Sequence, residues 1–200
     1  METPYFLVAL PQLNDPAFAR TVVLVTHHGD EGANGLVINV PLVNEEDSQT
    51  QMVAEVKDTD GETLSEYEEF LFEGGPVNEE TLFAIHDIEA LADGDTPITN
   101  EVFLASNPDA FHRLLESEDF KNRRRFFVGC ATWEAGQLDS ELRTGAWFTV
   151  PFKKEYLFKK IEEDTDQKKW QDDLWVQILR EGGGDPFTMM GQGPVDSGYN

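Results

Sequence analysis

The chain has 200 residues, of which 39 are acidic and 15 are lysine or arginine, so its formal net charge at pH 7 is −24. This length is typical of one compact domain, and the 40% of hydrophobic residues supply enough apolar volume for its core. The composition therefore excludes wholesale disorder. The charge argues against direct nucleic-acid binding and against an anionic membrane surface, since both need cations that face phosphates.

The negative charge is concentrated in the first part of the chain. Residues 1–120 contain 26 acidic and three basic side chains, whereas residues 121–200 contain 13 and 12. Residues 44–80 alone carry 13 acids and one base. Such a run is typical of a solvated loop or face, and a cation-collecting or partner-binding surface is the alternative.

The cellular compartment follows from three features of the sequence. The N-terminal segment has no basic region, and its short apolar run stops at Pro11, so we expect neither a signal peptide nor a membrane anchor. No apolar run approaches the roughly 18 residues that span a bilayer. Cys130 is the single cysteine, which agrees with a reducing compartment. We therefore predict a cytoplasmic protein.

Short apolar runs between turn residues predict strands that are covered on both faces. The four clearest candidates are residues 5–10, 21–26, 35–39 and 125–130. Further strands are predicted over residues 70–72, 81–85, 102–105 and 147–150. Residues 11–16 and the glycine-containing residues 27–35 are predicted to be turns.

The helix signals lie later in the chain. Residues 106–109 combine capping side chains with an early proline, which predicts a helix that ends near Glu118. A second helix is predicted over residues 164–182, and shorter ones over residues 138–142 and 153–161. We therefore predict a single α+β domain over residues 1–182, with a mixed sheet and several flanking helices. A Gly/Pro-rich tail, which we expect to be flexible, follows over residues 183–200.

The histidines are the first candidates for chemistry, since the sequence lacks the common local motifs for phosphate binding, serine hydrolysis and zinc proteolysis. His27 and His28 precede Asp30, so an imidazole and a carboxylate could meet in one loop. Adjacent strand residues point to opposite faces, which disfavours a metal site that uses both histidines. His86 and Asp87 likewise place an imidazole beside a carboxylate after a predicted strand. We predict neither a bound metal nor a cofactor.

Three other features have both a functional and a structural interpretation. Cys130 precedes a turn, where a thiol could be activated, but we expect a buried structural cysteine. Gly74 and Gly75 could let backbone N–H groups approach an anion, but we expect a tight connection whose backbone dihedrals exclude larger residues. The basic residues 121–125 could hold a phosphate, but we expect them to form ion pairs within or between subunits.

Three blocks of sequence resemble the signature of the AlgH/YqgE family of bacterial proteins. They comprise residues 6–9 and 15–24 with His28 and residues 32–39, then residues 74–77, and finally residues 129–138 with Glu141 and residues 145–147. Their order and spacing fit over residues 3–150. The acidic segment, the basic cluster and the tail depart from the common pattern.

The resemblance implies an α+β domain whose strongly bent sheet forms a pseudo-barrel. It implies no catalytic residue, because the family is uncharacterised and has only a proposed regulatory role in some members. We therefore expect a cytoplasmic binding or regulatory protein that acts through a protein or small-molecule partner.

The alternative function is an enzyme or a small-ligand-binding protein. Its site would be formed by His28, Asn39, Gly74, Gly75, Cys130 and Trp133. We expect residues 30–39, 74–77 and 130–138 to meet at one end of the sheet, around a shallow groove lined by Asn39, Gly75 and Trp133. In the competing interpretation the glycines serve turns and Trp133 fills the core.

Overall fold

The computed structural model describes residues 2–10, 13, 15–42, 51–57, 63–161, 165–185 and 188, with the backbone alone for residues 51–70 and 118. The helices in this part of the chain are α1 (Pro108–Leu115), α2 (Gln137–Arg143) and α3 (Gln167–Glu181). The strands are β1 (Tyr5–Ala9), β2 (Val22–Gly29), β3 (Gly32–Val37), β4 (Gln51–Lys57), β5 (Thr63–Glu73), β6 (Val77–His86), β7 (Thr96–Pro97), β8 (Phe103–Ala105), β9 (Arg124–Trp133) and β10 (Trp147–Pro151). Four short 3-10 helices connect them, at Pro16–Phe18, Glu89–Leu91, Glu118–Arg123 and Lys154–Tyr156.

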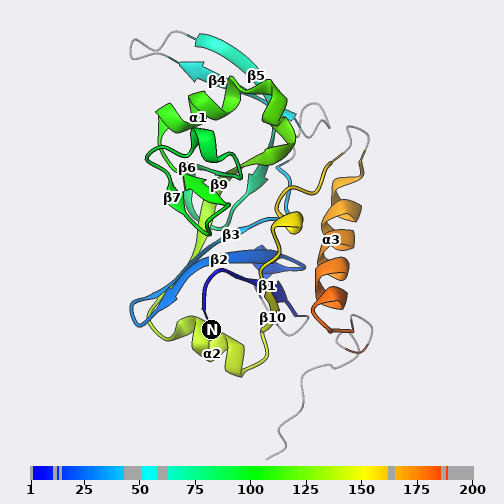
Figure 1. Cartoon of the computed structure of the whole chain (residues 1–200). Coiled ribbons are helices and arrows are strands. Elements are labelled where there is room, and N and C mark those ends of the chain that lie inside the picture. Colours follow the sequence, from blue (N-terminus) through cyan, green and yellow to red (C-terminus); the bar gives the residue numbers. More distant parts are fainter. Residues whose placement is uncertain are drawn as a thin grey trace, which may run out of the picture.

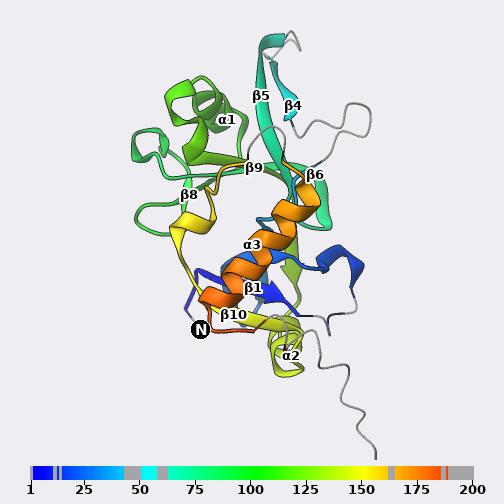
Figure 2. The same ribbon diagram turned by 90° about the vertical axis from the view of Figure 1, so that its right-hand side faces the viewer.

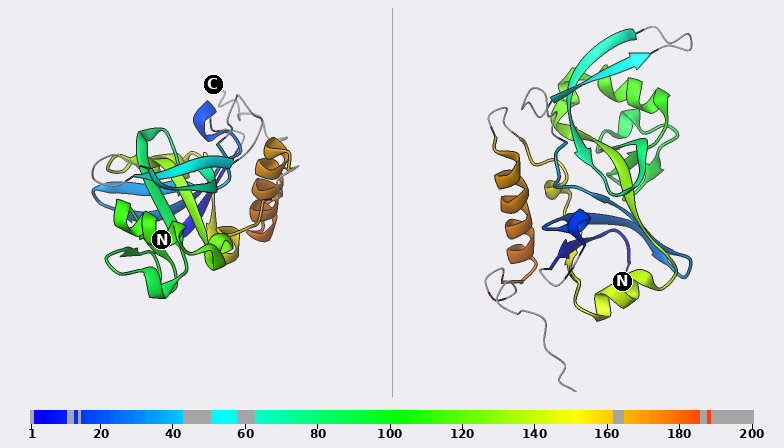
Figure 3. Two further views of the ribbon diagram at one scale, coloured as in Figure 1. Left: turned by 90° about the horizontal axis from the view of Figure 1, so that it is seen from above. Right: turned by 180° about the vertical axis from the view of Figure 1, so that it is seen from behind.

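The strands form one sheet that curls into a half-barrel (Figure 1). Its order is β10-β1-β2-β3-β9-β6-β8-β7, and β5 joins it by pairing with β9. The β5–β9 pair is parallel and the other pairs are antiparallel, so the sheet is mixed. The hairpin of β4 and β5 projects beyond the body of the sheet (Figure 3). The predicted α+β class with a bent, mixed sheet is confirmed.

The central strands are buried on both faces, which explains their continuous apolar runs. On one face of β1, Phe6 and Val8 pack with residues of α3 such as Leu174, and α3 lies across β1 and β10 (Figure 2). On the other face, Tyr5 and Leu7 belong to a cluster that includes Leu138 of α2. A third cluster joins α1 to β6 and β9. The prediction of buried strands at these positions is confirmed.

Two local predictions are wrong. Residues 27–35 are mostly strand and not a loop, because the β2–β3 pairing continues to the pair Gly29 and Gly32. Residues 153–161 form only a 3-10 turn and not a helix, because Tyr156, Leu157 and Ile161 are buried in the core beside α3 along an irregular path. The sequence reading also missed β4 and the short β7.

The two helices that open with capping side chains begin as predicted. Asn107 accepts a hydrogen bond from the backbone N–H of Ala110 (2.9 Å), and Asp166 accepts one from that of Lys169 (2.8 Å). These bonds satisfy amide groups that the first turn of a helix leaves without partners.

Parts of four predicted segments lie outside the described residues. They are residues 186, 187 and 189–200 of the tail, residues 44–50 and 58–62 of the acidic segment, residues 11, 12 and 14 of the first predicted turn, and residue 164 of the second predicted helix. In the part of the chain that the structure describes, no helix has the length and apolarity needed to cross a bilayer.

The three arginines of the basic cluster, residues 123–125, form contacts within the domain. Arg123 forms the expected internal ion pair, with its Nε 2.7 Å from Oδ1 of Asp87. Arg124 is buried and donates to backbone carbonyls at the end of α1. The guanidinium of Arg125 lies over the ring of Phe72, 4.4 Å from its centroid, and burial lowers the pKa of Arg125 to about 9. These residues form structural contacts, so the cluster is not an open basic patch.

Glu181 joins the end of α3 to the segment after β10. Its Oε2 accepts hydrogen bonds from the hydroxyl of Tyr156 (2.5 Å) and from Nζ of Lys153 (2.9 Å). Its Oε1 accepts one from Nε2 of Gln177 (2.9 Å). These donors, Tyr156 first, lower the pKa of Glu181 to about 2.

Replacing Glu181 by Gln should lower the free energy of unfolding near pH 7 by about 1 kcal/mol, since the carboxylate is partly exposed and screened. Because its folded pKa is depressed, this stabilisation is present above the ordinary pKa of 4.5 and is lost as the pH falls toward 2. Urea unfolding of both proteins at neutral and acidic pH measures the difference. Glu155→Gln, at an exposed site, should have little effect, and a Glu181 difference that persists at pH 2 would contradict the assignment.

Candidate functional site

A polar pocket lies between the β2–β3 turn and the start of α2. It has a volume of about 370 Å³ and is lined by His28, Gly29, Asp30, Gly136 and Asp139. His28 comes from β2, and Asp30 follows in the turn. Gly136 has a φ of 73°, a left-handed conformation that favours glycine, and it leads into α2, whose first turn carries Asp139. Two chain reversals therefore bring an imidazole and two carboxylates to one opening.

A chain of polar contacts fixes the imidazole in this pocket. The hydroxyl of Tyr5 lies 2.8 Å from Nδ1 of His28, and Nε2 of His28 lies 3.4 Å from Oδ1 of Asp139. Burial, and secondly the charge of Asp139, raises the pKa of Tyr5 to about 12, so the phenol keeps its proton. The phenol can then donate to Nδ1, which leaves the proton of a neutral imidazole on Nε2, toward Asp139.

The order Tyr5, His28 and Asp139 has the form of a nucleophile, a base and an orienting acid. An activated nucleophile needs a lowered pKa and access to substrate, whereas the pKa of Tyr5 is raised and its residue is only 2% exposed. The side chain of His28 is 13% exposed and that of Asp139 is 59% exposed. The arrangement therefore orients an accessible imidazole–carboxylate pair and does not activate the phenol.

The three segments that the sequence placed together do meet. Ala33 of β3 pairs with Trp133 of β9, and Val77 pairs with Cys130. The backbone N–H of Val37 donates to the carbonyl of Gly74 (2.8 Å), whose own N–H donates to Val128 (2.7 Å). This part of the prediction is confirmed.

The prediction of a groove at this meeting point is wrong. Gly75 is buried, Asn39 is 0% exposed and Trp133 is 5% exposed. The Trp133 ring packs against Phe18 and Trp147, and its indole N–H donates to Glu141 (3.0 Å). The competing interpretation, in which Trp133 fills the core, is the one that the structure supports.

The two glycines of the β5–β6 connection serve close backbone approach. A Cβ atom on Gly74 would lie 2.2 Å from the carbonyl oxygen of Gly129. Gly75 has a φ of 143°, and a Cβ atom there would lie 2.4 Å from the carbonyl carbon of Cys130. A side chain at either position would force the chain away from β9, so both glycines have a structural function.

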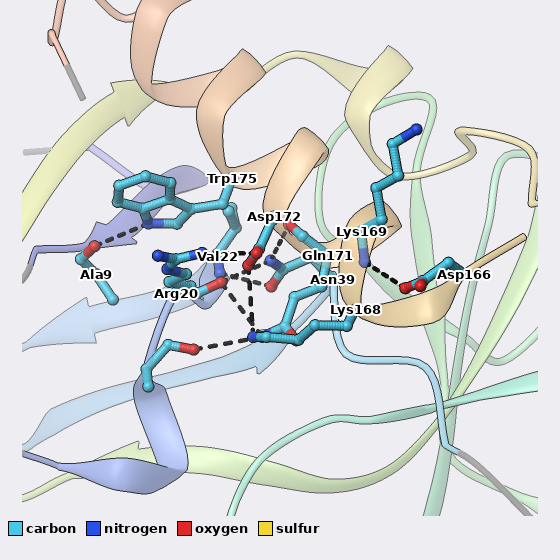
Figure 4. A network of polar contacts seen from close by, with 11 residues as sticks. Ala9, Arg20, Val22, Asn39, Asp166, Lys168, Lys169, Gln171, Asp172 and Trp175 are labelled. Carbon is cyan, nitrogen blue, oxygen red and sulfur yellow. Dashed lines mark hydrogen bonds and ion pairs between the residues drawn. The ribbon is translucent and has the colours of Figure 1, made fainter. Parts of the chain in front are cut away.

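Asn39 connects the start of β2 to α3 (Figure 4). Its Oδ1 accepts a hydrogen bond from the N–H of Val22 (2.7 Å), and its Nδ2 donates to the carbonyls of Arg20 (2.9 Å) and Gln171 (3.2 Å). Its amide is therefore engaged in structural contacts away from the pocket.

Among the six candidate residues, His28 lines the pocket and the other five do not. Tyr5 and Asp139 were not predicted as site residues. Tyr5 sits within a uniformly apolar strand, and Asp139 has the ordinary pattern of an acid in the first turn of a helix. No local sequence signal distinguishes them. The other candidate histidine, His86, is fully buried, with its Nε2 2.9 Å from Oδ2 of Asp95.

Comparison with known proteins places this architecture in a family. The family model described as DUF179, AlgH-like, matches residues 6–187. The chain belongs to the AlgH-like family. A UPF0301 protein of Xanthomonas euvesicatoria is 35% identical over 166 residues, which cover 82% of this chain and 83% of that protein. A UPF0301 protein of Photobacterium profundum is 32% identical over 157 residues, which cover 78% and 83%.

Solved structures of similar proteins share the fold of this AlgH-like chain. The solution structure of the AlgH protein from Pseudomonas aeruginosa has a TM-score of 0.62 and 22% identity, and the match covers 100% of both chains. The crystal structure of a protein from Corynebacterium diphtheriae has a TM-score of 0.60 and 21% identity, and covers 90% of this chain and 88% of that one. The resemblance inferred from the sequence is confirmed.

Replacing Asn39 by Ala should reduce the free energy of unfolding by about 2–3 kcal/mol, because buried backbone groups lose their partners. Asn34→Ala, at an exposed site on β3, should change it by less than about 0.5 kcal/mol. Urea denaturation monitored by tryptophan fluorescence measures both. Equal effects of the two substitutions would refute the structural assignment of Asn39.

Cys130 is half-buried, and burial raises the pKa of its thiol although a weak contact with Asn78 opposes this. Because the thiolate is the reactive form, the native protein should react with iodoacetamide near pH 7.5 several-fold more slowly than the urea-unfolded chain. Mass spectrometry gives both rates at this single cysteine. Faster labelling of the native protein would point instead to an activated thiol.

Proposed function

We propose that this AlgH-like chain is a cytoplasmic binding protein that holds a group of its partner non-covalently in the pocket at His28. The observation that carries the proposal is the contact between the buried Tyr5 hydroxyl and Nδ1 of His28. This contact orients an imidazole that remains partly accessible from the pocket. A binding site gains affinity when its polar groups are held in place before the ligand arrives.

The shape of the pocket agrees with this function. Gly29 and Gly136 are part of its lining and carry no side chain that would block the entrance. The pocket is large enough for a small molecule or for one side chain of a protein. The imidazole and the carboxylates supply the few directed polar groups that such sites use for specificity.

The enzyme alternative has no comparable contact in its favour. The Cys130 thiol and the Trp133 ring are not part of the pocket lining. Trp133 and Glu141 hold α2 against the sheet, and Glu141 also accepts a hydrogen bond from the indole of Trp147 (2.7 Å). These side chains support the wall that carries Asp139, which is a structural role.

A fragment screen observed through the histidine ring signals tests the proposal. We expect one or more fragments to shift the His28 ring resonances saturably. When binding is followed by the backbone amide resonances of Gly29 and Gly136, which also line the pocket, His28→Gln should weaken it about tenfold or more. His27→Gln, at the exposed neighbouring position, should not. Thermal unfolding of both variants confirms that the fold is retained. Equal loss in the two variants, or a screen in which His28 never responds, would refute the proposed site.

A further inference from the structure

We infer that the pocket at His28 binds a cationic group with several N–H donors, namely a primary ammonium. This inference rests on the proposed function and specifies its ligand class. Its sources are a free amine or the side chain of a lysine in a partner protein, which share the same chemistry.

The charged groups that line the pocket are carboxylates. The guanidinium of Arg143 donates to the backbone carbonyl of Asp139 (3.2 Å) but is not part of the lining. Asp30 and Asp139 line it, and the exposed Glu31 lies next to Asp30 in the β2–β3 turn. The lining contains no lysine or arginine. These carboxylates belong to a chain of net charge −24, so the field attracts cations and repels anions.

The hydrogen-bonding groups point to the same ligand class. A carboxylate only accepts hydrogen bonds, and the imidazole of His28 already has the Tyr5 hydroxyl at Nδ1 and Oδ1 of Asp139 at Nε2. Asp139 is largely exposed, so its carboxylate can accept further bonds, and Asp30 adds two more acceptor oxygens. A lining with more acceptors than donors suits the three N–H donors of an ammonium.

A metal ion is the other cation to consider. Among the described residues, no group of three histidine, cysteine, aspartate or glutamate side chains has the geometry to hold one. His28, Asp30 and Asp139 border a common opening without converging on one point. This arrangement favours an organic cation that forms separate hydrogen bonds over an ion that needs a closed set of ligands.

Three probes with the same carbon chain isolate the charge of the ligand: n-butylammonium, n-butanol and butyrate. Each is titrated at constant ionic strength while the His28 ring resonances are followed by NMR. We expect saturable shifts with butylammonium alone. Asp139→Asn should weaken that binding about tenfold. Asp109→Asn, which removes an exposed carboxylate from the first turn of α1, away from the pocket, should leave it unchanged.

A capped lysine, N-acetyl-lysine methylamide, distinguishes the two sources of the ammonium. Binding that is clearly tighter than that of butylammonium would indicate a lysine of a protein partner, and equal or weaker binding would indicate a free amine.

The outcomes separate this inference from the proposed function. Binding of butanol or butyrate that depends on His28 would overturn the cationic ligand class and leave the proposed site intact. Butylammonium binding that Asp139→Asn does not weaken would also overturn it. If neither these probes nor any fragment shifts the His28 ring, both the ligand class and the proposed function are overturned.

Discussion

Strand β9 joins the two halves of the sheet, because it pairs with β3, β5 and β6. Its first part pairs with β6 and with the parallel strand β5, and its last three residues pair with β3. Gly129, with a φ of 75°, lies at the register shift in the β6–β9 pairing, where Gly74 and Gly75 also approach β9, and it precedes the residues that pair with β3. The end of β9 leads through Gly136 into α2. The course of this strand therefore sets the position of Asp139 as well as the curvature of the sheet.

The charge balance and the packing are linked through the few basic residues. Arg124 and Arg125 are buried, and Arg123 pairs with Asp87. Arg20 pairs with Asp172 at 2.6 Å, which ties the 3-10 turn before β2 to α3 (Figure 4). Burial removes Arg124 and Arg125 from the surface, whereas Arg20 and Arg123 are about half exposed and each neutralises one carboxylate. A positively charged partner would meet a chain in which acidic side chains outnumber basic ones by 24.

Much of the fold could be predicted from the sequence, because buried strands and capped helices each have a recognisable residue pattern. Strands covered on both faces read as continuous apolar runs, and the capped helices have their own start signals. The prediction of a helix over residues 153–161 was wrong, because the spacing of three buried residues there suits a helix as well as an irregular path. The groove expected at Asn39, Gly75 and Trp133 was a second error. Glycine and tryptophan occur both where chains pack closely and where ligands bind. The sequence alone therefore does not distinguish a structural role from a binding role at these positions.

The pocket itself could not be predicted, because it depends on a local break in the alternation of β2. Tyr5, Val23 and Val25 belong to the cluster on the α2 side of the sheet, and strict alternation would place His27 on that side too. The β2–β3 register shifts between Val25 and His27, so that two residues of β2 oppose one residue of β3. Such a bulge moves the following side chains to the other face. It is therefore His28 that reaches Tyr5 and Asp139, while His27 is exposed, and the paired histidines alone do not reveal which of the two lies in the pocket.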